Sequence, residues 1–477
     1  MRILFIDCSM DTKINHPQHV FPPLEAGYCI SILEKEHTCF LIDLRIKQYS
    51  LNSLKTRLEH IKPDIVLIKP EIVYVELAQD IAKHFNNIKR SQVSYKKNKD
   101  GLSNSGIVVC YGPLATLKPE LFLHKGTAID FCFRGEIEAI LPKFIQTLPN
   151  EVNISGKIEG LASLEEGILK TNRIVVVNDV DSLPIPKHEL FSKNSYSFYY
   201  PMNKLIFARP GFVQSSRGCP NKCSFCSVME RTSYGHNYRA RKAENVVREI
   251  EHLVSLGKNI VYFIDDNFMV ERDRVKKICK LIIKKKLNHK IRWAVQARAD
   301  QFSSDLIEIM KKANCSTVCI GMESGCEKVL RKMDKKITTV QISKTVKRLQ
   351  NKGIFVVGFF IVGYPGQTRA DLMQDLSFSK EILPELLQLH FFKKYPDAYG
   401  LFTREECDLD STHKSSTDNY KSRMNGKHDI RHKFYIGYYL SFRYIFLKLP
   451  KVIPYYFINS LNFRGFFYKL ISYFYIK

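Results

Sequence analysis

The sequence predicts an α/β protein built from two successive regions in which strands alternate with helices. Short apolar runs, typical of strands buried on both faces, recur along both regions. Segments with the apolar spacing of amphipathic helices separate these runs. Alternation of this kind gives a parallel sheet covered by helices. The chain of 477 residues is long enough for about three domains.

The first region spans residues 1–150. Strands are expected at Arg2–Asp7, Cys39–Asp43, Asp64–Lys69, Ile107–Tyr111 and Ile129–Arg134. Helices are expected at Leu24–Glu34, Leu51–His60, Val75–Phe85, Lys118–Leu123 and Ile137–Thr147. This order indicates a flavodoxin-like, Rossmann-like sheet, which binds ligands at the carboxyl ends of its strands. The basic stretch Lys89–Gly106 is expected to be an insertion.

Residues 151–205 are interpreted as a hairpin and a linker. The segment GILKTNRIVVVND, residues 167–179, resembles a β-hairpin. The segment DSLPIPKHEL that follows is a connector punctuated by prolines.

Residues 206–395 return to the alternation of strands and helices. Strands are expected at Phe212–Ser216, Ile260–Asp265, Ile291–Ala297, Thr317–Gly321, Phe355–Ile361 and Leu386–Phe392. Helices such as Ala243–Leu256 and Arg272–Lys286 lie between them. The pattern predicts a partial (β/α)6 barrel of the TIM type, with its site at the carboxyl ends of the strands.

Composition and the amino terminus favour a cytosolic protein. No stretch reaches the roughly 18–20 apolar residues of a membrane-spanning helix. The first residues, MRILFIDCSM, are typical of a strand and not of a signal peptide. An odd number of cysteines, 13, argues against a disulfide framework. We expect the scattered ones to be buried small apolar residues: Cys8, Cys39, Cys110, Cys132 and Cys319.

Three other cysteines are grouped in the segment SSRGCPNKCSFCSV, residues 215–228. Cys219, Cys223 and Cys226 have the spacing C-x3-C-x2-C and follow a predicted strand. Iron–sulfur clusters are normally held by four thiolates, so three thiolates leave one iron open to a chelating ligand. The alternative is a structural zinc site that His236 would complete.

This motif resembles the signature of the radical S-adenosylmethionine (SAM) superfamily. There, the open iron of a [4Fe–4S] cluster binds the amino and carboxylate groups of SAM, and the aromatic residue before the third cysteine, here Phe225, lies by the adenine. Four later segments resemble strand-end motifs of the same superfamily: YFIDDNF (262–268), WAVQARAD (293–300), IGMESG (320–325) and GFFIVGYPGQT (358–368).

The resemblance implies a set of residues that bind SAM. These are Asp265, Asp266, Gln296, Arg298, Glu323, Ser324, Gly363 and Gly366. By this likeness, the aspartates lie near the methionine moiety, the Glu-Ser pair near the ribose and the glycines near the adenine. Relatives usually have Glu where this chain has Gln367. The alternative for each polar strand-end residue is a turn or a helix cap.

The first region resembles the cobalamin-binding domain that precedes the barrel in one radical SAM subfamily, which includes carbon methyltransferases and an anaerobic ring cyclase. The likeness lies in residues 21–44, 108–115 and 130–141. The candidate contacts are Pro22, Pro23, Leu24, Gly112, Pro113, Arg134, Gly135 and Glu136. The sequence lacks D-x-H-x-x-G, and we interpret His16 and His19 as surface residues. Bound cobalamin should therefore lack a histidine lower ligand; the alternative is a domain without the cofactor.

The resemblance implies an enzyme that cleaves SAM reductively to a 5′-deoxyadenosyl radical, for cobalamin-dependent C-methylation or cyclisation of a small or lipid-like metabolite. One alternative is modification of RNA or nucleotides, although the second cysteine set and C-terminal β-barrel of the RNA methylthiotransferases are not seen in this sequence. Another alternative is a non-catalytic metal-binding sensor or scaffold.

The net charge of +25 indicates an acidic partner, or a genome that favours lysine. A flavodoxin or ferredoxin is the electron donor that the resemblance implies. Cations at the barrel mouth would steer it: Lys222, Arg231, Arg239 and Arg241.

Residues 396–477 form a basic, aromatic tail with helical character. Its last part, 431–477, contains eight Lys or Arg residues, many Tyr and Phe, and no acidic residue. Pro450 and Pro454 divide it into short helical pieces. Such a composition suits peripheral contact with the inner face of a membrane. The alternatives are packing of the rings on the barrel and binding of single-stranded nucleic acid.

Overall fold

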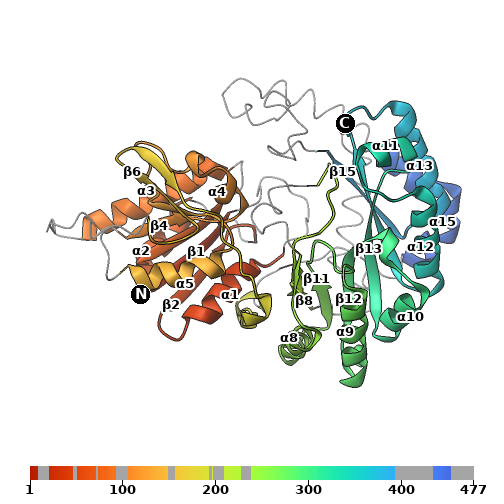
Figure 1. Cartoon of the computed structure of the whole chain (residues 1–477), viewed down its shortest axis with the longest axis horizontal. Coiled ribbons are helices and arrows are strands. Elements are labelled where there is room, and N and C mark those ends of the chain that lie inside the picture. The colour runs from red at the N-terminus through yellow and green to blue at the C-terminus, as the bar shows by residue number, and fades with distance from the viewer. Residues whose placement is uncertain are drawn as a thin grey trace. The chain divides into compact units, whose positions relative to one another are not determined.

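The computed structural model describes residues 1–8, 21–46, 51–70, 74–92, 106–148, 156–192, 196, 209–226, 238–392 and 433–452. The chain divides into two compact units (Figure 1). Unit 1 comprises Met1–Ser197 and Met229–Arg239, and unit 2 comprises Phe198–Val228 and Ala240–Lys477.

Unit 1 is an α/β unit around one seven-stranded sheet of order β2-β1-β3-β4-β5-β6-β7. The first five strands are parallel: β1 (Arg2–Cys8), β2 (Thr38–Asp43), β3 (Ile65–Pro70), β4 (Ile107–Cys110) and β5 (Phe131–Phe133). The helices are α1 (Leu24–Leu33), α2 (Leu51–Ile61), α3 (Val75–Gln92), α4 (Pro113–Leu117) and α5 (Ile137–Thr147). The predicted parallel sheet is confirmed.

Helices cover both faces of this sheet because its strands are apolar throughout. Along β1, Leu4 and Ile6 belong to the core that includes residues of α2 and α3. The intervening Ile3 and Phe5 belong to a second core, shared with α1 and α5. Successive side chains of a strand point to opposite faces, so an uninterrupted apolar run fills two cores.

The predicted hairpin at 167–179 is wrong in position. The hairpin is formed by β6 (Leu161–Glu165) and β7 (Ile168–Thr171), and it extends the sheet of unit 1 in antiparallel fashion beyond β5. Its two-residue turn has positive φ at Glu166 (49°) and Gly167 (80°), as a type I′ turn requires. The Val-rich run that suggested the hairpin makes one isolated bridge, between Gly135 and Val175.

A smaller difference concerns the helix predicted at Lys118–Leu123. The structure has α4 before it and a 3-10 turn, Pro119–Leu121, in its place. Pro119 has no amide hydrogen and so cannot continue the hydrogen-bond ladder of α4. Helix α3 extends to Gln92 and so includes the first residues of the predicted insertion Lys89–Gly106. Residues 93–105 lie outside the described residues.

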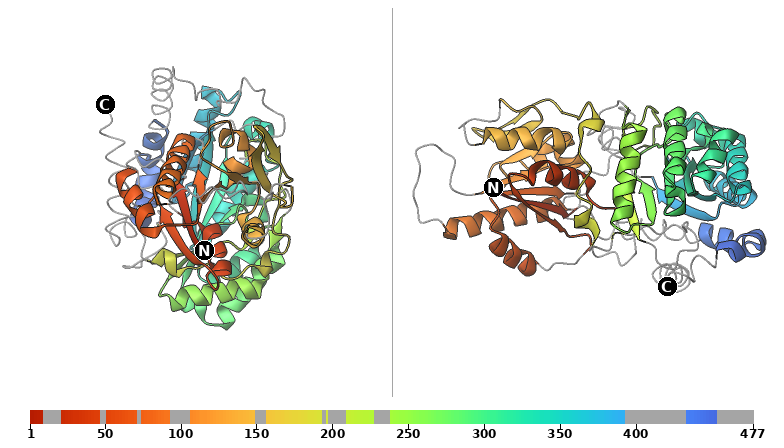
Figure 2. Two further views of the ribbon diagram at one scale, coloured as in Figure 1. Left: turned by 90° about the vertical axis from the view of Figure 1, so that its left-hand side faces the viewer. Right: turned by 90° about the horizontal axis from the view of Figure 1, so that it is seen from below.

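Unit 2 is built on a six-stranded parallel sheet whose order follows the sequence, with β8 and β15 at its ends. The strands are β8 (Pro210–Val213), β11 (Ile260–Phe263), β12 (Arg292–Arg298), β13 (Cys315–Glu323), β14 (Phe355–Val362) and β15 (Leu386–Phe391). The helices are α8 (Ala243–Ser255), α9 (Arg272–Lys284), α10 (Ser304–Lys312), α11 (Glu327–Lys332), α12 (Thr339–Asn351) and α13 (Arg369–Ile382). Figure 2 shows these helices ranged along the outer side of the strands. The six predicted strands and the helices between them are confirmed.

The described part of the tail packs on the last strand. Residues 433–439 are helical, and α15 (Phe442–Leu447) follows. Tyr439 and Tyr435 accept hydrogen bonds from the amides of Leu387 and Leu389, both at 3.0 Å. Tyrosine hydroxyls therefore satisfy backbone groups of a strand whose one partner among the described strands is β14.

A buried ion pair strengthens this contact, since Lys448 donates to Glu385 at 2.6 Å. Of the alternatives for the tail, packing of the rings on the barrel therefore applies to Tyr435 and Tyr439. No helix within the described ranges has the length and apolarity needed to cross a bilayer.

Candidate functional site

The three grouped cysteines lie on one loop after β8 and the short strand β9 (Ser216–Arg217). None of the three forms a disulfide with another described residue; Cys223 is buried and the other two are partly exposed. The amide of Cys226 donates to the carbonyl of Cys223 at 3.2 Å, which tightens the end of the loop. The loop begins at Gly218, whose φ of 77° suits glycine. It therefore emerges at the carboxyl end of the first barrel strand, as predicted.

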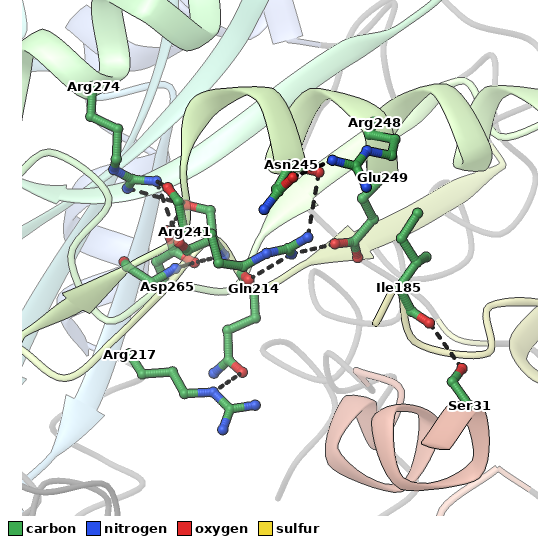
Figure 3. Close-up of polar contacts among 12 residues, drawn as sticks. Ser31, Ile185, Gln214, Arg217, Arg241, Asn245, Arg248, Glu249, Asp265 and Arg274 are labelled. Carbon is green, nitrogen blue, oxygen red and sulfur yellow. Dashed lines mark hydrogen bonds and ion pairs between the residues drawn. The ribbon is translucent and has the colours of Figure 1, made fainter. Parts of the chain in front are cut away.

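Asp265 anchors the start of this loop (Figure 3). It follows β11 and is buried. Its carboxylate accepts the amides of Ser215 at 2.6 Å and Ser216 at 3.1 Å, and also the Ser215 hydroxyl. Arg274 of α9 donates to the same serine, at 3.2 Å from its hydroxyl oxygen. Burial raises the pKa of Asp265, which Arg274 and the donors oppose. In this structure, Asp265 is committed to holding the loop.

Two arginines that sequence reasoning assigned to steering an electron donor are used inside the fold. Arg241 forms a buried ion pair with Glu249 and donates to the carbonyl of Gln214 at 3.2 Å (Figure 3). Arg239 pairs with buried Glu136 at 2.7 Å within unit 1. The prediction is wrong for these two, because a paired and buried charge exerts little field at the surface. Arg231 lies outside the described residues, and Lys222 is exposed.

The far end of the cysteine loop is clamped to the turn after α11. The amide of Ser224 donates to the carbonyl of Met333 at 3.0 Å. The Ser224 hydroxyl lies 2.7 Å from the Tyr364 hydroxyl, which donates to the carbonyl of Lys332 at 3.0 Å. Sequence reasoning missed Ser224 and Tyr364, although Tyr364 stands inside the GYPG segment that it singled out.

Nitrogen donors point at two of the three sulfur atoms. Arg298, the last residue of β12, places Nη1 3.3 Å from Cys223 Sγ. Asn221 places Nδ2 3.3 Å from Cys219 Sγ. Donors of this kind suit sulfur that carries negative charge, as the thiolate ligands of an iron–sulfur cluster do. The loop therefore fits a cluster.

A single metal ion is a different case. Among the described residues, no three His, Cys, Asp or Glu side chains are grouped as one ion would require. His236, the residue that would complete a zinc site, lies outside the described residues.

Glu323 and Phe225 meet at one buried lysine. Lys335 Nζ lies 2.6 Å from Glu323 Oε1 and 5.2 Å from the centroid of the Phe225 ring. Glu323 ends β13 with a φ of 61°, a left-handed conformation that a non-glycine residue adopts at a cost. A Cβ on Gly321 would lie 2.3 Å from Glu323 Oε1, so only glycine leaves room for the pair. Sequence reasoning missed Lys335, which sits in a Lys-rich turn without a motif.

Gln367 organises the loop that contains Gly363 and Gly366. Its Oε1 accepts the amide of Gly363 at 2.7 Å, while its Nε2 donates to Asp375 Oδ2 at 2.9 Å. Asp375 in turn accepts the hydroxyl of Ser324 at 2.5 Å. Gly363 and Gly366 are exposed and have φ near 80° and 74°. The side-chain amide of Gln367 thus accepts one hydrogen bond and donates another. An ionised carboxylate at this position could only accept.

Two further predicted residues lie on or after the strands. Gln296, on β12, donates to the hydroxyl of Tyr262 at 2.7 Å. Asp266 is exposed beside the buried Asp265. Together with Phe225, Glu323 and Ser324, they belong to the carboxyl ends of parallel strands or the segments that follow them.

In unit 1, the predicted cobalamin contacts all follow carboxyl ends of the parallel strands, but several have structural tasks. Gly135 has a φ of 120°, and a Cβ there would lie 1.9 Å from the carbonyl oxygen of Val175. Glu136 accepts the amide of Val177 at 2.7 Å in addition to its ion pair with Arg239. Arg134 donates to the carbonyl of Thr116 at 3.1 Å. The close approach of another chain segment explains why glycine stands at 135.

The remaining contacts are Pro22, Pro23, Leu24, Gly112 and Pro113. Pro23 precedes α1, which begins at Leu24. Gly112 precedes α4 with a φ of 92°, and a Cβ there would approach the Lys69 side chain to 3.1 Å. His16 and His19 lie outside the described residues.

A cluster of buried charges lies at the same strand ends and was missed from the sequence. Arg45 Nη2 is 2.6 Å from Asp43 Oδ2 and 3.4 Å from Asp7 Oδ2. Tyr196 donates to Asp43 at 2.9 Å. Lys69 pairs with Glu25 of α1. These residues come from five separate segments, so periodicity along the chain carries no signal for the cluster.

Comparison with known proteins agrees with this geometry. Residues 213–379 match the model of the radical SAM superfamily. An uncharacterised methyltransferase of Pyrococcus horikoshii is 28% identical over 377 residues, which cover 79% of this chain and 76% of that protein. The anaerobic magnesium-protoporphyrin IX monomethyl ester cyclase of Cereibacter sphaeroides is 25% identical over 407 residues, which cover 83% of this chain and 62% of that protein.

A solved structure shares the fold. It is that of the cobalamin-dependent S-adenosylmethionine radical enzyme OxsB with aqua-cobalamin and S-adenosylmethionine bound. The match has a TM-score of 0.65 and 21% identity, and it covers 90% of this chain and 56% of that one.

The cysteine loop and most of the parallel sheet that carries it lie in the segment, residues 213–379, that matches the radical SAM superfamily, and the chain is similar to a methyltransferase and a cyclase over most of its length. Its likeness to the cyclase and to OxsB extends over residues of both units, since it covers 83% and 90% of the chain.

The first prediction concerns Gln367. Burial raises the pKa of Asp375 to about 6. In Gln367→Glu a second carboxylate would stand where the amide now donates to Asp375. The two carboxylates raise each other's pKa in the folded state, so stability is lost as the pH rises through these values. We expect a loss of about 1–3 kcal/mol at pH 8, and a clearly smaller loss at pH 5.5, where Asp375 holds a proton.

Urea unfolding of the full chain at both pH values measures this effect. Gln367→Met, which adds no charge, is the matched control and should show much less dependence on pH. An equal loss of stability at pH 5.5 and pH 8 for Gln367→Glu would contradict the assignment.

Proposed function

We infer that this protein is a cobalamin-type radical SAM enzyme that converts a small or lipid-like substrate by C-methylation or cyclisation. The observation that carries the inference is the cysteine loop. Its three thiols emerge at a strand end, its two sides are anchored by Asp265 and Ser224, and nitrogen donors face Cys219 and Cys223. Anchoring of this kind limits the movement of the loop that carries the sulfur ligands.

Cys219, Cys223 and Cys226 would hold a [4Fe–4S] cluster. The chemistry that such a cluster supplies when bound is one-electron reductive cleavage of SAM to methionine and a 5′-deoxyadenosyl radical. Arg298 and Asn221 donate to the sulfur ligands and fix their orientation. Asp265 acts indirectly, because it holds Ser215 and Ser216 ahead of the loop.

Residues at the neighbouring strand ends would bind SAM. Phe225 offers a ring face to the adenine, and the Glu323 carboxylate, held by Lys335, offers acceptors to ribose hydroxyls. The turns at Gly363 and Gly366 leave backbone accessible on either side of Tyr364, where no Cβ intervenes. Ser324, Gln296 and Asp266 complete the proposed set.

Cobalamin would lie on the carboxyl edge of the unit 1 sheet, against Pro23, Leu24 and Gly112. When bound, it would supply a methyl group to the substrate radical in C-methylation, or accept an electron from that radical in cyclisation. The fold of unit 1 supports this proposal, since open parallel sheets bind ligands at this edge. Gly135 and Glu136 would act by shaping the edge, given their contacts with Val175 and Val177.

An acidic flavodoxin or ferredoxin would deliver the electron. Exposed cations remain beside the cysteine loop and its clamp: Lys222, Lys332 and Lys336. Ser224 forms hydrogen bonds with Lys332 and Met333, so these cations lie in the same region of the surface. Complementary charge of this kind speeds the encounter of partners.

Contact with a membrane surface is proposed for α15. Phe442 and Phe446 lie one turn apart with ring centroids 4.3 Å apart, and they are 73% and 61% exposed. Leu440 and Leu447 beside them are also exposed, as are Arg443 and Lys451. No acidic residue occurs from 431 to 477. Apolar rings flanked by unopposed cations suit the interface of an anionic bilayer, which would also concentrate a lipid-like substrate.

The second prediction tests the cluster. The anaerobically reconstituted chain should bind four irons and cleave SAM to 5′-deoxyadenosine in the presence of a strong reductant. Single substitutions of Cys219, Cys223 or Cys226 by Ala should abolish both, because each thiolate holds a different iron. Cys315→Ala removes a buried thiol from β13 and is the matched control. Full iron content and cleavage in any triad variant would refute the assignment.

The third prediction concerns cobalamin. The full chain should retain hydroxocobalamin in equilibrium dialysis, with the absorption spectrum of a base-off cobalamin. A chain with all three triad cysteines replaced by Ala should bind it equally well, because the proposed contacts lie in unit 1. Absence of retained corrin would favour a domain that keeps the fold without the cofactor.

The fourth prediction concerns membrane contact. Phe442→Gln with Phe446→Gln should weaken cosedimentation with vesicles containing phosphatidylserine by about tenfold or more, because burial of one such side chain is worth about 1.5–3 kcal/mol. Val340→Gln is the matched control, since Val340 is equally exposed, at 73%, but lies on α12. Equal sedimentation of the double variant and the wild type would exclude this role for α15.

A further inference from the structure

We propose that Arg298 sets the reduction potential of the cluster on the cysteine triad, by a charged hydrogen bond to Cys223 that Asp300 moderates. The inference rests on the proposed function, which assigns the cluster to this triad. It goes beyond that function, because it names the residues that decide how strongly the cluster holds an electron.

Every nitrogen of the Arg298 guanidinium is engaged. Nη1 lies 3.3 Å from Cys223 Sγ, and Nη2 lies 2.5 Å from the carbonyl oxygen of Lys335. Nε and Nη2 donate to the two carboxylate oxygens of Asp300, at 3.2 and 3.1 Å. With three partners held by its planar fork of donors, the guanidinium keeps one orientation, so its N–H remains aimed at the sulfur.

The site is sheltered enough for this charge to act. Arg298 is 8% exposed and Cys223 is 5% exposed. Water therefore screens the interaction between the guanidinium and the sulfur only weakly. The potential of an iron–sulfur cluster depends on the hydrogen bonds to its sulfurs, its charge and its exposure. A fixed positive donor favours the reduced cluster, which carries one more negative charge, and so raises the potential.

Asp300 acts in the opposite direction. Its carboxylate faces the guanidinium from the far side and offsets part of the positive charge. Its side chain is 29% exposed, so solvent screens it more than it screens Arg298. Two other buried charges near the loop are paired: Lys335 with Glu323, and Asp265 with Arg274 and its serine donors. The cations Lys222, Lys332 and Lys336 are exposed, so solvent screens them more than it screens Arg298. Asn221, the donor to Cys219, carries no charge.

A purely structural role for Arg298 predicts different shifts of the reduction potential. If the guanidinium only pins Cys223 to the turn at Lys335, then removal of Arg298 or of Asp300 disturbs the same contacts. Both variants should then shift the potential in the same direction or leave it unchanged. An electrostatic role requires shifts of opposite sign.

The experiment compares three variants of the full chain, each reconstituted anaerobically. Arg298→Gln removes the charge and keeps a nitrogen donor. Asp300→Asn removes the opposing charge. Arg292→Gln is the matched control: it loses the same charge at the other end of β12, roughly 20 Å away at about 3.3 Å per residue. The midpoint potential is measured by redox titration followed with electron paramagnetic resonance, so the readout does not depend on catalytic activity.

We expect the potential of Arg298→Gln to fall by about 60 mV or more, which is a tenfold smaller ratio of reduced to oxidised cluster at a fixed potential. The potential of Asp300→Asn should rise by a smaller amount, and that of Arg292→Gln should equal the wild type. A full cluster with an unshifted potential in Arg298→Gln, or a shift of equal sign in Asp300→Asn, overturns the inference.

If Arg298→Gln assembles no cluster, Asp300→Asn decides alone, and a potential that does not rise counts against the proposal. A wild-type chain without a cluster would instead refute the proposed function, on which the inference rests. The two failures are thus distinguishable.

Discussion

The anchoring of the cysteine loop to the ends of the barrel strands is the constraint on which the rest of the site depends. A loop of nine residues, 218–226, has no helix or strand of its own to fix three thiols. Buried Asp265 supplies acceptors to the backbone ahead of it, and Ser224 ties its far side to the turn after α11. Since unpaired buried polar groups are costly, each of these contacts resists displacement of the loop.

The fold was largely predictable from the sequence, because parallel strands buried on both faces are continuous apolar runs with clear ends. The strand Leu386–Phe391 and the helix Ile137–Thr147 lie within a residue of their expected bounds. The hairpin was misplaced because the Val-rich run at 174–177 has strand composition but only one bridge partner. Composition reports the preference of a segment, whereas the position of its partner is set by the tertiary fold.

The site was predictable only in part. Glu323 and Arg298 were proposed from the resemblance to superfamily motifs, and the structure has them as the last residues of β13 and β12. Lys335, Tyr364 and Asp375 were missed because each acts through a partner distant in sequence: Lys335 pairs with Glu323, Tyr364 with Ser224, and Asp375 with Ser324. Gln367 depends on such a partner, since its amide donates a hydrogen bond to Asp375, a buried acid outside the motif.

The packing of the tail on β15 has a consequence for synthesis of the chain. Tyr439 bonds to Leu387, 52 residues earlier, and Tyr444 bonds to Glu385, 59 residues earlier. While the ribosome makes the intervening residues, the outer edge of the last strand lacks these partners. A nascent barrel at that stage presents open backbone donors and acceptors to its neighbours on a polysome. The edge of β15 is therefore covered only after the residues that contain Tyr439 and Tyr444 have been made.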